Sequence, residues 1–78
     1  MKKYENPLTN NICQVLSPLI GDMMASGVIK AQATKLGITE ESILPAHLPV
    51  LAEAIEKGLV IFLGSEVAQQ VGEKIKAL

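Results

Sequence analysis

The stretch His47–Leu63, HLPVLAEAIEKGLVIFL, decides the fold, because its apolar residues recur at the spacing of a helix. Pro49 suits the first turn of a helix, where its missing N–H is not needed. Gly64 supplies a residue that can end the helix. The main apolar row follows steps of three and four and comprises Leu48, Leu51, Ala52, Ile55, Leu59, Phe62 and Leu63. The stretch therefore predicts the central helix of an all-α protein.

A second apolar row runs along the same stretch, about half a turn away from the first. The row consists of Val50, Ala54, Gly58 and Ile61, and only Glu53, Glu56 and Lys57 are charged in this helix. Small and apolar side chains have no use on a surface that faces water in a monomer. We therefore predict that this row is an interface with another protein chain.

The segment before the central helix predicts one long first helix. Asn6-Pro7 has the form of an N-cap followed by proline at the first helical position. Apolar residues then keep a 3.6-residue rhythm as far as Met23, through Pro18, which predicts a kink. The alternative, a new helix capped by Ser17, stays open. Ser26-Gly27 predicts the break that follows, and residues 1–5 are expected to be frayed.

Small residues lie opposite the apolar face of this first helix. Ser17, Gly21 and Ala25 are four residues apart, and such a row lets another backbone approach closely. We take these three residues as a second candidate interface, beside the simpler interpretation that they face water.

The rest of the chain predicts a short helix with a turn, and a last helix. Val28 to Leu36 forms the short helix, closed by Gly37. Thr39-Glu40-Glu41 begins a further turn that Pro45 ends. Ser65 is expected to cap the last helix, Glu66 to Leu78. No strand-like alternation or internal repeat is evident. The prediction is one domain over residues 1–78, a small bundle of about four helices.

Composition favours a protein that associates with copies of itself. The chain has 78 residues, of which 49% are hydrophobic, and a mean hydropathy of +0.34. A domain of this size has a large surface fraction, so some apolar area faces outward in the monomer. The commonest way to cover such area is a symmetric homodimer. We therefore expect a homo-oligomer, with a dimer favoured and a further protein partner as a second possibility.

Several function classes find no support in the sequence. All seven basic residues are lysines and the net charge is −1, so nucleic acid is not an expected partner. Cys13 and His47 are the whole stock of soft metal ligands, and we expect no metal, no cofactor and no catalysis. Cys13 is expected to be a buried thiol, and His47 to make a local hydrogen bond or to contact solvent.

The hydropathy pattern bears on location. No apolar segment follows the lysines of MKKYENP, so a secretory signal is not expected. The uncharged window Asn6–Gly21 is too short and too polar to span a bilayer. A cytoplasmic protein without a membrane span is the expectation.

Two alternative functions rest on particular residues. Residues 29–44, IKAQATKLGITEESIL, resemble a helix-turn-helix, with Ala33, Gly37, Ile38 and Ile43 at the positions of small, turn and core residues. The resemblance implies a DNA-binding regulator, but Pro45 would shorten its recognition helix, and a basic patch is absent. The other alternative is a carrier of an apolar ligand, with a cavity lined by three residues, Met23, Met24 and Phe62.

The sequence as a whole favours a non-catalytic helical interaction module that self-associates and has a regulatory or scaffolding role. The DNA-binding regulator and the apolar-ligand carrier stay open beside this hypothesis.

Overall fold

A computed structural model describes residues 4–78, and within that part of the chain all regular structure is helical. This confirms the predicted all-α bundle of four helices. The four α-helices and two short 3-10 helices, in chain order, are α1 (Pro7–Ile20), α2 (Asp22–Lys35), η1 (Glu40–Ser42), η2 (Pro45–His47), α3 (Leu48–Leu63) and α4 (Ser65–Lys76).

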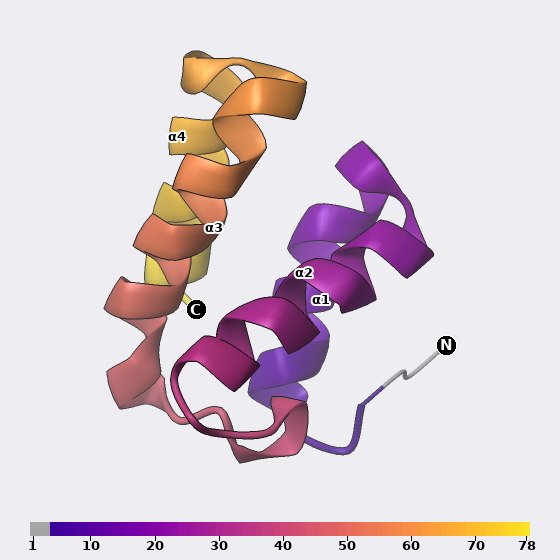
Figure 1. Ribbon diagram of the computed structural model, residues 1–78, viewed down its shortest axis with the longest axis vertical. Coiled ribbons are helices and arrows are strands. Elements are labelled where there is room, and N and C mark those ends of the chain that lie inside the picture. Colours follow the sequence, from indigo (N-terminus) through magenta and orange to yellow (C-terminus); the bar gives the residue numbers. More distant parts are fainter. Residues whose placement is uncertain (1–3) are drawn as a thin grey trace.

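The helices form two hairpins, and in each hairpin a single glycine joins the two helices. In Figure 1, α1 with α2 and α3 with α4 each fold back on themselves, and the two hairpins diverge towards their tips. Gly21 forms one tip with φ 85° and ψ 160°, and Gly64 forms the other with φ 83° and ψ 161°. Each glycine N–H donates to the carbonyl four residues earlier, and each glycine carbonyl accepts from the N–H four residues later. Only glycine adopts this backbone region readily.

The two hairpins also bury equivalent positions, so the chain contains a structural repeat that the sequence pattern did not reveal. Counted from the tip glycine, the positions nine before, five before and four after are fully or almost fully buried in both hairpins. These positions are Ile12 and Ile55, Leu16 and Leu59, and Ala25 and Ala68. The repeat escapes sequence inspection because only the core positions and the glycine are shared.

The first helix begins at Pro7 with Asn6 as its N-cap, as predicted, but the predicted boundary between the first two helices is wrong. α1 passes through Pro18 but ends at Ile20, so it is shorter than predicted, and no helix starts at Ser17. The chain reverses at Gly21, and α2 runs without a break through Ser26-Gly27. An interior glycine costs a helix only about 1 kcal/mol, whereas the positive φ at the tip requires one.

At the other helix ends, some of the predicted capping residues are confirmed and others are wrong. Gly37 does close α2, with φ 74°, and the Ile38 N–H donates to the Ala33 carbonyl at 3.0 Å. Ser65 does not cap α4, because Gly64 holds that position and no side chain bonds there. α4 ends at Lys76.

The core lies between the four helices and includes the linker residue Ile43. The main apolar row of α3 is buried as predicted, except near the tip, where Leu63 is half-buried and Phe62 is 66% exposed. Phe62 lies near the tip, where the two hairpins diverge (Figure 1), and it lines a hollow between α2 and α3.

A polar cluster at the base of the molecule joins α1 to the linker between the hairpins. The Asn6 side chain caps α1 by accepting from the Leu8 N–H at 2.9 Å, and donates to the carbonyls of Ile43 at 2.8 Å and Glu41 at 3.1 Å. The Thr9 hydroxyl, which is fully buried, donates to the Glu40 carbonyl at 2.5 Å. These hydrogen bonds hold the linker, and with it the start of the second hairpin, against the first turn of α1.

The expectation that residues 1–5 are frayed is wrong for Tyr4 and Glu5, and residues 1–3 lie outside the described part of the chain. The Tyr4 side chain is 7% exposed and packs on the core. The Glu5 N–H donates to the Glu41 carboxylate at 3.3 Å.

Replacing Asn6 with alanine is expected to lower the free energy of unfolding by about 2 kcal/mol. The change removes an N-cap, worth about 1 kcal/mol. It also removes two hydrogen bonds to the linker, one exposed and one partly buried, which at the low end of the usual range contribute about 0.5 kcal/mol each. Urea unfolding followed by circular dichroism measures the loss. Asn11→Ala is the matched control, since Asn11 is exposed on the same helix and should change stability by less than about 0.5 kcal/mol. Equal effects in the two variants would contradict the role given to Asn6.

Candidate functional site

An apolar groove lies between α2 and α3, where the two hairpins diverge. Its volume is about 530 Å³. The helices provide its walls with the residues Met23, Met24, Gly27, Val28, Ala31, Gln32, Ile55, Gly58, Leu59 and Phe62. Gln32 is the only member of this set with a polar side chain, so the groove offers contact area and almost no hydrogen bonding.

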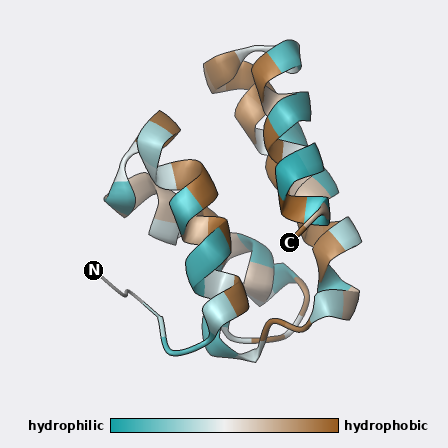
Figure 2. Ribbon diagram, turned by 180° about the vertical axis from the view of Figure 1, so that it is seen from behind, coloured by the Kyte–Doolittle hydropathy of each residue, from teal (hydrophilic) through white to brown (hydrophobic). Residues whose placement is uncertain are grey.

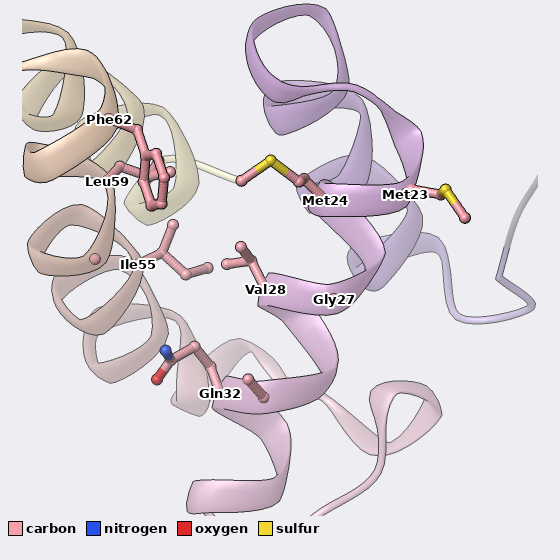
Figure 3. Close-up of a pocket in the computed structure, with 10 residues that line it drawn as sticks. Met23, Met24, Gly27, Val28, Gln32, Ile55, Leu59 and Phe62 are labelled. Atoms are coloured by element: carbon pink, nitrogen blue, oxygen red, sulfur yellow. The ribbon is translucent and has the colours of Figure 1, made fainter.

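The side chains of the two walls point towards each other. Figure 3 shows Val28 and Met24 of α2 directed at α3, and Ile55 and Phe62 of α3 directed at α2. Met23 stands at the rim, and its side chain points away from the groove. Ile55 and Leu59 are almost fully buried and form the floor, while Phe62 is accessible.

The groove continues from the tips towards the base. A second hollow of about 140 Å³ is lined by Gln32 and Lys35 of α2, by Leu36 directly after that helix, and by Val50, Leu51 and Ala54 of α3. Gln32 lines both hollows. From Met24 to Leu36 the α2 wall is about 18 Å long at 1.5 Å per residue. The groove is thus long enough for about three turns of a packed helix.

Large apolar side chains are exposed beside the groove and at the hairpin tips. Met23 is 90% exposed, Ile61 is 86% exposed and Phe62 is 66% exposed. All three lie within three residues of a tip glycine, and Figure 2 shows hydrophobic segments next to both tips. Since both tips lie at the same end of the molecule (Figure 1), that end is unusually apolar.

At two positions in the groove walls, nothing in the structure of the monomer requires a glycine. Gly27 and Gly58 lie inside α2 and α3 without a positive φ, and a Cβ atom at either would have no neighbour within 4 Å. The other glycines have evident reasons: Gly21, Gly37 and Gly64 take positive φ, and a Cβ at Gly72 would meet the Glu56 side chain.

The predicted row on α3 is accessible. Val50 is 52% and Ile61 86% exposed, Gly58 is exposed and Ala54 is half-buried. Gly58 lines the larger hollow, whereas Val50 and Ala54 line the smaller one. Three of the four residues therefore line the groove, and Ile61 is exposed near the tip of the same helix.

The second predicted row is not a helix face, so this prediction is wrong as a description of the surface. Gly21 separates two helices, and Ala25 is fully buried in the core. Ser17 is half-buried, and its hydroxyl lies 3.6 Å from the Cys13 sulfur.

The titratable and nucleophilic residues do not converge. Cys13 is buried, as predicted. The His47 Nδ1 accepts a hydrogen bond from the Leu44 N–H at 2.9 Å, which is one of the two roles expected for this residue. In residues 4–78 there is no group of three or more His, Cys, Asp or Glu side chains that could hold a metal ion.

The segment that resembles a helix-turn-helix lacks a second helix. Between Gly37 and the end of this segment at Leu44, the chain forms only the three-residue η1, and Ile43 and Leu44 are extended. A recognition helix needs several turns to enter the major groove, so the candidate surface lies elsewhere.

The predicted row on α3 supplies Gly58 to the larger hollow and Val50 and Ala54 to the smaller one, but most of the α2 wall was not predicted. Taking Ser26-Gly27 as a break hid the fact that Met24, Val28, Ala31 and Gln32 share one helix face. Their spacing of three and four was the available signal. Met24 and Phe62, which the carrier hypothesis had placed at a cavity, do line the groove.

No family model, curated protein or solved structure matches this chain. Within the described residues, no helix combines the length and apolar character needed to cross a membrane.

Proposed function

We propose that this protein is a non-catalytic helical interaction module that self-associates through the apolar surface beside its groove. The observation that carries the proposal is the exposure of Met23, Ile61 and Phe62 at one end of a small domain. A monomer gains nothing from presenting such side chains to water. Contiguous apolar patches larger than a few hundred Å² usually mark interaction sites.

The chemistry of the surface also fits this function. Protein interfaces are depleted of charge at their centre and enriched in aromatic residues and methionine. The residues that form the larger hollow are all uncharged, and they include Phe62 and Met24. The charged pair Lys57–Glu53, exposed and 3.4 Å apart, borders this surface, because both residues line a shallow hollow with Val50 and Ala54. Charge at the rim of an interface is usual.

The test is the substitution Ile61→Glu, measured as the dissociation constant of the dimer by analytical ultracentrifugation. A carboxylate in an apolar interface is left without a partner, so the loss should be about 2 kcal/mol or more, roughly 30-fold in Kd. Helicity should be unchanged, because Ile61 is 86% exposed in the monomer.

Leu44→Glu is the matched control, because Leu44 is also exposed, at 58%, but lies in the linker at the opposite end. It should leave the Kd within about twofold of the wild-type value. Equal weakening by both substitutions would point to a non-specific effect of charge and contradict the proposed surface.

A second candidate function is favoured by the volume of the groove. Binding sites for small molecules typically measure about 300–1,000 Å³, and the larger hollow has about 530 Å³. An apolar ligand held between Met24 and Phe62 would make the protein a carrier. Such sites usually hold several polar groups that orient the ligand, but in this groove Gln32 alone is polar. Native mass spectrometry tests this function, since a carrier would retain a bound apolar molecule.

A further inference from the structure

The glycines of the groove walls indicate how closely another helix approaches. A glycine inside a helix is less stable there than alanine, and at Gly27 and Gly58 no close contact within the monomer requires the missing Cβ. Both lie in the same groove, one in each wall. A missing Cβ lets the axis of a neighbouring helix come nearer, so these positions suit a close helix contact from outside the chain.

The two walls have matching edges along the mouth of the groove. On α2 the edge is formed by Met23, Gly27 and Ala31, and on α3 by Ile61, Gly58 and Ala54. Each edge has its large side chain nearest the tip, then glycine, then alanine, at steps of about one helical turn. Gly27 and Gly58 each lie six residues from a tip glycine, and both line the same hollow. The edges are therefore alike in size pattern and level.

We propose that a second copy of this chain docks groove to groove, so that α2 and α3 of both copies form one four-helix bundle. The two-fold axis runs parallel to the helices, which brings both pairs of tips to the same end. Each α2 edge then packs against the partner's α3 edge, glycine facing glycine and alanine facing alanine. The inference rests on the proposed self-association and specifies the surface and geometry that would carry it.

The exposed apolar area supplies much of what a stable dimer needs. Four apolar residues beside the groove are exposed by 43–86% and would be covered; they are Met24, Val50, Ile61 and Phe62. At roughly 200 Å² for a large side chain at full exposure, they offer on the order of 500 Å² before the small residues are counted. A standard interface buries about 800 Å² per partner. The groove is also uncharged at its centre, so two copies do not repel there.

The first experiment replaces each wall glycine with leucine and measures the dimer Kd by analytical ultracentrifugation. Both Gly58→Leu and Gly27→Leu should raise the Kd at least tenfold, because the added side chain separates the two edges. Stability measured at concentrations far below the Kd should not fall, since a Cβ at either position meets nothing in the monomer and leucine is a better helix former than glycine. Gln70→Leu, on an exposed position of α4, is the control and should leave the Kd unchanged.

The second experiment tests the pairing of the edges. Two single-cysteine chains, Ala31→Cys and Ala54→Cys, each also carrying Cys13→Ser, are treated with a short bismaleimide alone and mixed. The mixture should give a crosslinked dimer that neither chain gives alone, since the bundle places position 31 of one copy beside position 54 of the other.

The outcomes separate this inference from the proposed function. A wild-type dimer whose Kd is unchanged by both leucine substitutions, with no crosslink in the mixture, overturns the groove-to-groove arrangement and leaves self-association standing. A wild-type monomer throughout the accessible concentration range overturns both. A monomer that retains an apolar small molecule assigns the groove to the carrier function instead.

Discussion

The variant Ile12→Ala is expected to lose about 2–5 kcal/mol of unfolding free energy, a larger effect than that of any other substitution proposed for this protein. Ile12 is completely buried in α1, so its truncation leaves a cavity among residues that both hairpins contribute. A domain of 78 residues has a total stability of about 4–12 kcal/mol. The variant should therefore unfold at a much lower urea concentration, and at the low end of that range it should not fold at room temperature.

The matched control is Ile61→Ala, which removes the same atoms from a side chain that is 86% exposed. Measured at concentrations where the monomer prevails, it should change stability by less than about 0.5 kcal/mol. The same change should weaken dimerisation. A large loss of monomer stability from Ile61→Ala would place that side chain in the core and contradict the exposed end of the molecule.

The second large effect is expected for Gly64→Ala, with a loss of about 1–3 kcal/mol. The tip glycine has φ 83° and ψ 161°, a region that residues with a Cβ atom scarcely populate. The loss does not come from a steric clash of the alanine side chain, because a Cβ at this position would meet no atom within 4 Å. The loss therefore comes from the backbone alone. Chemical denaturation at low protein concentration measures it.

Gly58→Ala is the control for this prediction, since the chemical change is identical but the residue lies inside a helix with ordinary dihedrals. It should stabilise the monomer by about 0.5–1 kcal/mol. The two substitutions thus have opposite expected signs. If both were destabilising to the same degree, the distinction between tip glycines and wall glycines would be lost.

The central helix was predictable because its own sequence contains every determinant it needs. Pro49 lies in the first turn, the apolar spacing is helical, and Gly64 stops the helix, so α3 was placed to within one residue. The all-α class follows from the same local patterns. The accessible row from Val50 to Ile61 could also be identified, because a helix that is apolar on two sides has more apolar surface than one neighbour covers.

The first hairpin was not predictable in the same way, because two glycines competed for the break. Gly21 and Gly27 can both end a helix by composition, and Ser26 before Gly27 gives that site the stronger turn pattern. The decision depends on tertiary packing: a reversal at Gly21 buries Ala25 and Ile29 against α1. The local sequence does not show this packing, so the reversal at Gly21 was not predicted. The α2 wall of the groove was not predicted for the same reason.

The measurement that tests the central claim most directly is the solution mass by light scattering after size exclusion, at two concentrations tenfold apart. Self-association through the exposed end and the groove predicts about twice the chain mass of 8.3 kDa at the higher concentration. A fall towards the chain mass on dilution would mark a weak dimer. A mass of one chain at both concentrations, with the helices intact by circular dichroism, would contradict the claim.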